Sequence, residues 1–349
     1  MNNTAMQICN ETIHPGESLS LALPLPELFT CSPVYMNIKI IHGKQAGPCL
    51  LLTAAMHGDA LNGTEIINRL LKSEALKNIK GTLIAVPVLN VYGFMNRSRY
   101  LPGGINLDSC FPGSSTGTHA ARMADLFVTE IFNKADMCID FQTGFINYTN
   151  LPQVFIDFQD EKSKKLAEIF NAPVISNISY EKGMLRTVAR NQKKPFLLYE
   201  AGEAMRFDEH AIRTGITGVL NIMQHLEMIA EHPVQKVTEL KSFFSEKNLW
   251  LRAAKSGISH TQYQLGQHIQ KDEILCVIQD PFGSDADYVV KSPEEAVIVG
   301  KNNLPLVHEG EALFQLAVFS KMHYAATHLE SWEEKHTELS RCVKITYPF

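Results

Sequence analysis

Several segments place chemically competent side chains directly after apolar runs. His57 ends the run GPCLLLTAAMHG (47–58), and Glu200 lies near the end of KPFLLYEAG (194–202). Ligands of open α/β sheets bind at the carboxyl ends of strands, where both residues would lie. A carboxylate there loses part of its hydration, which raises its pKa and suits a general base. For His57, the alternative is a ring that only hydrogen-bonds to a carbonyl of the turn. For Glu200, the alternative is an ordinary acid at the start of a helix, a role that Glu203 fits better.

A second candidate is the loop NVYGFMNRSRYLPGGINLDSCFPG (90–113), which carries Arg97, Arg99 and Asp108 among glycines and prolines. Long ordered loops at strand ends are usually functional. For Arg97, simple surface charge is an equally good interpretation.

A third candidate is CIDFQTG (138–144), in which Asp140 and Gln142 share one side of a strand because successive side chains alternate. Each of these signals is weak alone. Their order along the chain makes them specific.

The elements that must position these residues alternate between strand and helix patterns. Apolar runs predict strands at 36–43, 47–58, 81–90, 137–144, 154–158 and 194–202. Helical spacing predicts helices at 61–76, 118–135 and 208–230. This rhythm implies parallel pairing with helical crossovers, hence an α/β fold.

The pattern changes after about residue 240. From Leu249 onward, short apolar runs are separated by glycine turns, which predicts a small all-β module of ~80 residues. We expect an α/β domain at 1–240, the β domain at 241–320 and a helical tail at 321–349, with a linker near 231–246. The segment 323–340 is read as either a docking helix or a loose tail.

Composition narrows the class of protein. The 349 residues carry 32 Lys+Arg and 37 Asp+Glu, a net charge of -5, so neither nucleic acid nor membrane is expected as a partner. The N-terminus lacks a signal-peptide pattern, no run is long enough to span a bilayer, and the seven scattered cysteines form no disulfide framework. We therefore expect a cytoplasmic protein that takes a small-molecule ligand, with homo-oligomerisation left open.

The ordered motifs HGDALNG, NRSRYL, NLDSCFPG, DFQTG and EAGE resemble those of the succinylglutamate desuccinylase/aspartoacylase family, relatives of zinc carboxypeptidases. The resemblance runs from about Gly43 to Ile229. It implies a zinc-carboxypeptidase-like α/β/α sandwich followed by a small barrel-sandwich-like β domain. It also implies hydrolysis of N-acyl amino acids by zinc-activated water.

The resemblance assigns roles position by position. His57 matches the first zinc ligand and Glu200 the proton acceptor, while Arg99 matches the arginine that polarises the carbonyl. Ala60 and Gln142 stand where the family has its Glu and second His ligands. The substrate-binding positions are matched by Asn62, Arg97, Asp108 and Ser109. Of these, Asp108 and Ser109 stand where the family has an Asn-Arg pair, so this pair is altered.

These substitutions predict that zinc is not held tightly in the family's manner. Alanine has no donor atom, and a carboxamide is a poorer zinc ligand than imidazole. A site rebuilt from His57, Asp140 and Gln142 is the alternative, since Asp59 would face another way. His119 and His210 are read as surface or packing residues, and Cys110 as a neutral thiol.

Three hypotheses about function follow. The first is a protein without the ancestral activity, retained for binding or regulation, with zinc as cofactor by resemblance only and none bound here. The second is a working metal-dependent hydrolase with a remodelled site and a less acidic acylated amine as substrate. The third is an interaction subunit that pairs with an active relative. The β domain resembles biotinyl and lipoyl carriers but lacks their Met-Lys-Met hairpin, so we expect a structural or gating role.

Overall fold

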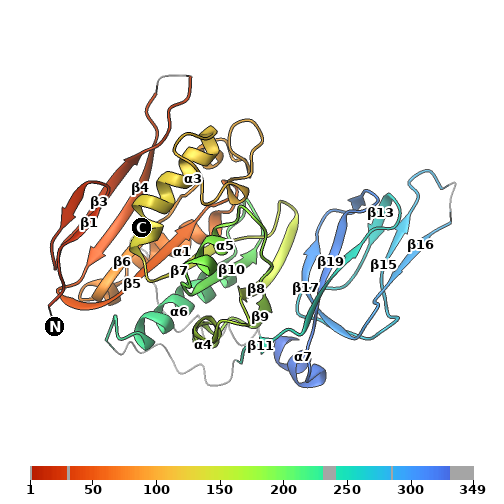
Figure 1. Cartoon of the computed structure of the whole chain (residues 1–349). Coiled ribbons are helices and arrows are strands. Elements are labelled where there is room, and N and C mark those ends of the chain that lie inside the picture. Colours follow the sequence, from red (N-terminus) through yellow and green to blue (C-terminus); the bar gives the residue numbers. More distant parts are fainter. Residues whose placement is uncertain (1, 30–31, 231–240, 284–285, 331–349) are drawn as a thin grey trace, which may run out of the picture.

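The computed structural model describes residues 2–29, 32–230, 241–283 and 286–330. A 13-stranded mixed sheet runs through the molecule (Figure 1). Its centre consists of parallel strands: β6 (Lys80–Val86), β5 (Gln45–Ala54), β7 (Met137–Gln142) and β10 (Phe196–Gly202).

Antiparallel strands flank this parallel centre. On one side lie β4 (Tyr35–His42) and β3 (Ser18–Pro24), and on the other lies β8 (Tyr148–Ile156). Two further strands continue from β8, namely β9 (Val174–Asn177) and β11 (Phe243–Phe244). A separate hairpin is formed by β1 (Met6–Ile8) and β2 (Glu11–Ile13).

Helices cover both faces of the sheet. One face packs against α1 (Leu61–Leu71), α4 (Glu161–Phe170) and α6 (Glu209–His225). The other packs against α3 (His119–Glu130) and α5 (Leu185–Asn191). The short helices are α2 (Val91–Met95), η1 (Glu74–Leu76), η2 (Leu107–Ser109) and η3 (Phe132–Lys134). None of the helices in the described part of the chain could cross a bilayer.

The alternation within β5 shows why the sequence folds into three layers. Leu50 and Leu52 join the hydrophobic cluster under α1 and α6, whereas Leu51 joins the cluster under α3. A strand that is apolar on both faces must be covered on both, which confirms the predicted α/β/α sandwich.

The C-terminal module is a small sandwich of two sheets. One layer belongs to the large sheet and contains β12 (Lys247–Arg252), β14 (His268–Ile269), β17 (Ala296–Asn302) and β19 (Ala312–Val318). The other is a four-stranded antiparallel sheet of β13 (Gly257–His260), β15 (Ile274–Gln279), β16 (Tyr288–Lys291) and β18 (Leu306–Val307). The apolar residues between the two layers form their own core. Helix α7 (Met322–Glu330) follows and contacts β14.

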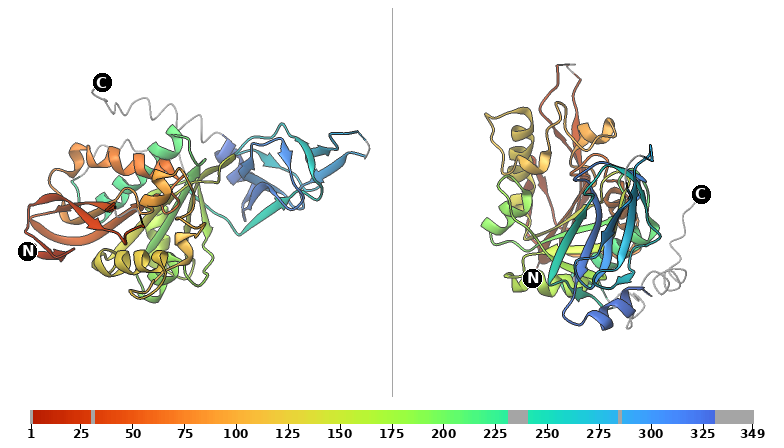
Figure 2. Two further views of the ribbon diagram at one scale, coloured as in Figure 1. Left: turned by 90° about the horizontal axis from the view of Figure 1, so that it is seen from above. Right: turned by 90° about the vertical axis from the view of Figure 1, so that its right-hand side faces the viewer.

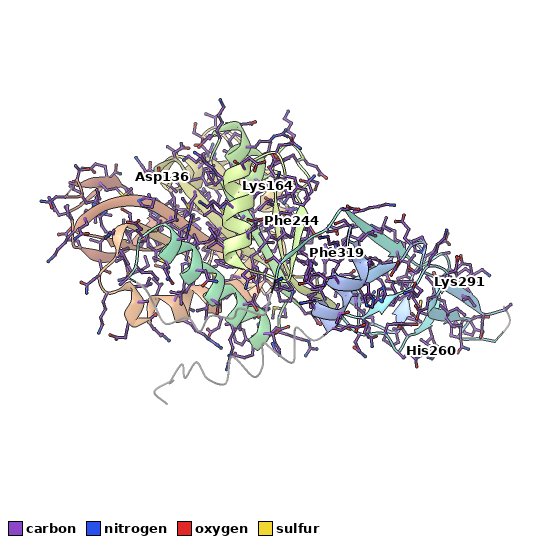
Figure 3. All side chains as sticks on the ribbon, turned by 90° about the horizontal axis from the view of Figure 1, so that it is seen from below. Asp136, Lys164, Phe244, His260, Lys291 and Phe319 are labelled. Carbon is purple, nitrogen blue, oxygen red and sulfur yellow. The ribbon has the colours of Figure 1, made fainter. Side chains whose placement is uncertain are left out.

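The module is joined to the α/β layers through backbone pairing. Strand β17 pairs antiparallel with β8, with Gly300 opposite Asn150. A Cβ on Gly300 would lie 2.7 Å from Asn150 Oδ1, so this close approach requires glycine. Aromatic contacts extend the junction, where the centroids of the Phe243 and Phe319 rings lie 6.1 Å apart. Figure 3 labels Phe319 in the β module and Phe244 in the α/β part of the chain. The module thus continues the sheet that carries the candidate site.

Most predicted elements are found, with a few additions. The N-terminal strands β1–β3, α4, β9 and α5 were not predicted from the sequence. Part of the expected linker forms β11, while 231–240 lie outside the described residues. The expected helix at 323–340 begins as α7, and its part beyond Glu330 lies outside them too. Figure 2 shows the N-terminal strands and the β module at opposite ends of the molecule. The domain boundaries at 240 and 320 stay a prediction.

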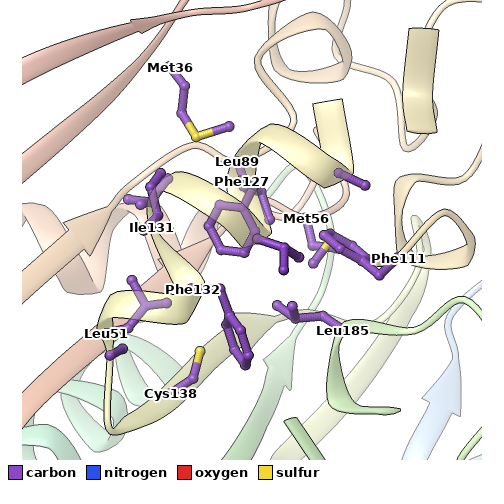
Figure 4. Packing of buried hydrophobic residues seen from close by; sticks show 14 of the residues in the cluster. Met36, Leu51, Met56, Leu89, Phe111, Phe127, Ile131, Phe132, Cys138 and Leu185 are labelled. Atoms are coloured by element: carbon purple, nitrogen blue, oxygen red, sulfur yellow. The ribbon is translucent and has the colours of Figure 1, made fainter. Parts of the chain in front are cut away.

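The aromatic cluster under α3 offers a test of the packing. Phe127 is fully buried, and its ring centroid lies 6.1 Å from that of Phe111 and 6.4 Å from that of Phe132 (Figure 4). We expect Phe127→Ala to lower the free energy of unfolding by about 3–5 kcal/mol, because it leaves a cavity in a close-packed core. Chemical denaturation measures this change. Phe282→Ala, at a ring that is 90% exposed, is the control, and equal losses in the two variants would contradict the packing.

Candidate functional site

The candidate site lies where β5, β7 and β10 end. Thr53 on β5 is in register with Asp140 on β7, and Gln142 on β7 is in register with Glu200 on β10. Parallel strands in register present neighbouring side chains on the same face, so these polar residues gather at one edge. The loop after β5 also contacts the loop after β10, since Met205 N donates to Asp59 O at 2.8 Å.

His57 lies in the turn between β5 and α1. Gly58 lets this turn pack against α2, because a Cβ there would lie 2.1 Å from the Gly93 carbonyl carbon. The His57 side chain is buried, and its Nδ1 has no hydrogen-bond partner among the described residues. Burial, followed by the positive charges of Arg99 and Arg186, lowers its pKa to about 3. His57 is therefore a neutral imidazole at physiological pH.

Asp140 and Gln142 form a closed pair on β7. Asp140 Oδ1 accepts a hydrogen bond from Thr53 Oγ1 at 2.7 Å, and Oδ2 accepts one from Gln142 Nε2 at 2.7 Å. Burial raises the pKa of Asp140, and both hydrogen bonds oppose this shift because they stabilise the carboxylate. The Gln142 amide group is thereby oriented by Asp140.

Glu200 is the carboxylate that most resembles a general base. It is partly buried on β10 and accepts a hydrogen bond from Asn150 Nδ2 on β8. Burial raises the pKa of Glu200 to about 7, against the lowering effect of Arg99 and Arg186. A carboxyl group with this pKa exchanges protons near neutral pH.

Arg99 extends from the loop after α2 toward these acids. The loop is held by Asn90, whose Nδ2 donates to the Arg99 carbonyl at 3.4 Å. The guanidinium carbon lies 4.2 Å from the centroid of the Phe145 ring, within cation–π distance. Burial lowers the pKa of Arg99, while Asp59 and Glu200 raise it. Asp59 Oδ1 is itself buried without a hydrogen-bond partner in the described part of the chain.

Asp108 is neutralised from within the protein. Arg186 Nη1 lies 3.5 Å from Asp108 Oδ2, and Leu185 N donates to Asp108 Oδ1 at 3.3 Å. Burial raises the pKa of Asp108 to about 6, with Arg186 opposing and Asp140 adding to the shift. Because Asp108 and Arg186 neutralise each other, little of the positive charge of Arg186 is available to a bound ligand.

The structure brings together some of the residues that the sequence singled out. His57, Arg99, Asp108 and Glu200 interact electrostatically, and Gln142 neighbours Glu200.

Three other predicted substrate-binding residues lie apart from this cluster or have local partners. Arg97 is exposed on the loop surface, and Ser109 is exposed with its Oγ donating to Asn106 O at 2.7 Å. The Asn62 amide bonds two backbone groups, Ala201 O at 3.3 Å and Asp208 N at 3.0 Å. Their roles in binding a ligand stay predictions.

Other sequence candidates have local partners. His119 Nε2 donates to Pro26 O at 3.0 Å, and the ring packs edge-on against Tyr92, as a packing residue would. Cys110 Sγ lies 3.4 Å from Asn106 O, and burial raises the pKa of its thiol, which disfavours a thiolate.

Sequence reasoning missed Arg186, Asn150 and Phe145. Arg186 reaches Asp108 from α5, an element that showed no clear pattern in the sequence. Asn150 lies at the start of β8, where an isolated polar residue gives no signal until its strand is placed beside Glu200. Phe145 follows the DFQTG motif directly, and only the contact with Arg99 gives it a role.

Residues 46–226 match the family described as "Succinylglutamate desuccinylase/Aspartoacylase catalytic domain". This match covers more than half of the chain. The protein therefore belongs to the succinylglutamate desuccinylase/aspartoacylase family, as the ordered motifs indicated.

Individual relatives are distant in sequence but close in fold. N-alpha-acetyl-L-2,4-diaminobutyric acid deacetylase from Halomonas elongata is 21% identical over 282 residues, which cover 78% of this chain and 82% of that protein. A succinylglutamate desuccinylase/aspartoacylase from Rhodobacter sphaeroides is similar with a TM-score of 0.77 and 20% identity, over 86% of this chain and 96% of that one. The ectoine utilization protein EutE (DoeB) from Ruegeria pomeroyi, solved with product bound, has a TM-score of 0.77 and 21% identity, over 86% and 95%. These likenesses confirm the fold.

The donor set does not fit the zinc that the family implies. Structural and catalytic zinc sites use at least three His, Cys or carboxylate ligands, and the described residues contain no group of three such side chains that could hold a metal. His57 supplies one nitrogen, buried Ala60 supplies none, and Gln142, whose Nε2 donates to Asp140, has only its amide oxygen to offer. No chemical step is therefore derived through a metal at this site.

The raised pKa of Glu200 predicts a pH-dependent stability. A carboxyl group whose pKa rises from 4.5 in the unfolded chain to about 7 in the folded protein stabilises the fold while protonated, and this contribution is lost as the pH rises. We expect the stability of the wild type relative to Glu200→Gln to fall by about 1–3 kcal/mol between pH 4.5 and 8. Urea denaturation at several pH values measures it.

The charged and polar groups that face Glu200 determine which controls the stability measurement needs. Arg99, Arg186, Tyr148 and Asn150 are unchanged in the Glu200→Gln variant, so their contributions largely cancel in the comparison. Glu309→Gln, at an exposed carboxylate of the β module, should show no such trend. A difference between wild type and Glu200→Gln that is constant with pH, or that grows, would contradict the buried state of this carboxyl.

Proposed function

We propose that this chain binds a small acylated amine at the edge formed by β5, β7 and β10, and does not hydrolyse it by the metal-dependent route of its family. The observation that carries this proposal is the donor set, in which one imidazole remains beside a methyl group and a carboxamide. The binding groups are those that need no metal. Arg99 can donate to an amide carbonyl, and Glu200 can accept from an N–H group.

The charges favour a ligand with few or no carboxylates. Four acids gather around two arginines, and the Asp108–Arg186 pair is satisfied internally. Arg99 therefore faces Asp59 and Glu200 as the remaining cation of the described cluster. These acids would repel an additional carboxylate on the ligand, whereas they would not repel a neutral or cationic amine. The similar deacetylase from Halomonas elongata is named for N-alpha-acetyl-L-2,4-diaminobutyric acid, which carries an acetylated amine, a second amine and a single carboxyl group.

A second candidate function is hydrolysis with a remodelled site. Its support is the retained combination of Arg99 with Glu200, whose pKa of about 7 suits proton transfer. Turnover of acylated amines that Glu200→Gln abolishes would favour this candidate over pure binding. An absence of turnover with added Zn²⁺, Mn²⁺ or Co²⁺ would exclude it.

Restoring the two missing ligands tests the interpretation of the metal site. We expect the wild type, purified without chelator, to hold far less than one zinc per chain. The Ala60→Glu/Gln142→His variant should hold about one, since three ligands then converge with an open position. Elemental analysis by mass spectrometry measures the content.

The matched control adds His57→Ala to that double variant, which should lose the metal again. A wild-type chain with one tightly held zinc would contradict the proposal. If the double variant does not fold, the zinc content of the wild type still decides.

Ligand binding gives the second test. We expect N-acetyl-1,4-diaminobutane to bind the wild type more tightly than N-acetylaspartate in calorimetric titrations. Arg99→Ala should weaken binding of the amine about 10–100-fold, because a charge-assisted hydrogen bond is lost. Arg122→Ala, at an exposed arginine on α3, is the control and should bind normally. Tighter binding of the dicarboxylate would contradict the charge argument.

A further inference from the structure

Several exposed apolar side chains lie on the segments that follow the parallel strands of the candidate site. Eight large apolar side chains are exposed in the described residues up to 230, and six of them lie on segments that follow the parallel strands: Met95, Tyr100, Ile105, Phe145, Ile146 and Phe207. Their exposed fractions run from 37% to 67%. Single exposed apolar residues are normal, but a gathering at one edge marks an interaction site.

Specific contacts join the segments that carry these side chains. The Arg99 guanidinium lies 4.2 Å from the Phe145 ring, which connects the loop after α2 with the loop after β7. Asn147 N donates to Glu203 Oε1 at 3.0 Å, which connects the loop after β7 with the loop after β10. Met205 N in turn donates to Asp59 O in the turn that carries His57. Phe145, Ile146 and Phe207 lie on these joined segments and are called here the apolar rim.

The rim and the polar groups within it differ sharply in character. Arg99 is largely withdrawn from solvent, and burial is the main cause of the shifted pKa values of both Arg99 and Glu200. The Phe145 side chain contacts the guanidinium while 52% of the residue stays exposed. Small-molecule sites combine a few polar groups of this kind with predominantly apolar surroundings.

We propose that the ligand is an amphipathic acylated amine whose medium or long apolar acyl chain covers the rim. This inference rests on the proposed function, because the amide group must occupy the Arg99–Glu200 pair for the chain to reach Phe145, Ile146 and Phe207. The polar groups bind the amide and the amine, and the rim binds the hydrocarbon. Burying the chain removes apolar surface of both ligand and protein from water.

A series of ligands that differ only in acyl length tests the proposal. The probes are N-acetyl-, N-hexanoyl- and N-decanoyl-1,4-diaminobutane, titrated calorimetrically below their micelle-forming concentrations. We expect Kd to fall at least about tenfold from the acetyl to the hexanoyl compound, because each buried methylene adds affinity. It should fall again for the decanoyl compound.

Variants at the rim separate this effect from the polar contacts. Ile146→Ser/Phe207→Ser leaves the Arg99–Phe145 contact intact and should flatten the dependence on acyl length without weakening acetyl binding. Phe282→Ser, at an exposed ring of the β module, should keep the full dependence. Both residues of the double variant are exposed, so we expect it to fold normally.

The outcomes distinguish this inference from the proposed function. Equal affinity across the series, with binding still lost in Arg99→Ala, overturns the amphipathic ligand and leaves the proposed function standing. Absence of binding by every probe overturns both. Sedimentation gives an independent check: a wild-type dimer that the rim variant converts to monomers would show that a second copy covers the rim, and would overturn the inference.

Discussion

The hydrogen bond from Gln142 to Asp140 is the interaction on which the site depends. It turns the amide donor of a residue at the end of β7 onto a buried carboxylate, at 2.7 Å, while Thr53 occupies the other oxygen. This bond leaves only the amide oxygen of Gln142 to face a ligand or a metal, and a carboxamide oxygen is a poorer zinc ligand than imidazole. The family fold is therefore retained here with a hydrogen-bonded carboxamide at the end of β7.

Ion pairs and hydrogen bonds within the protein explain how two of the acids at the site tolerate burial. Asp108 is paired with Arg186, and Glu200 accepts from Asn150, so these two acids have partners inside the protein. Asn150 also lies opposite Gly300 of the β module, whose lack of a side chain permits the close approach. The module is thereby connected to the site by the strand that carries the partner of Glu200.

The sequence was sufficient for the framework and for part of the site. Continuous apolar runs predicted β5, β7 and β10, and two of the polar residues singled out at their ends, Gln142 and Glu200, lie in register on neighbouring strands. Local patterns could not reveal Arg186 or Asn150, because their positions depend on the packing of α5 and the pairing of β8. The pairing of β17 with β8 was likewise hidden, since two segments about 150 residues apart show no mutual signal.

The most direct measurement is a crystal structure of the wild type grown with zinc in excess, with diffraction recorded on both sides of the zinc absorption edge. We expect no ordered anomalous peak beside His57, with Gln142 Nε2 still donating to Asp140. A fully occupied peak with tetrahedral surroundings at that imidazole would contradict it.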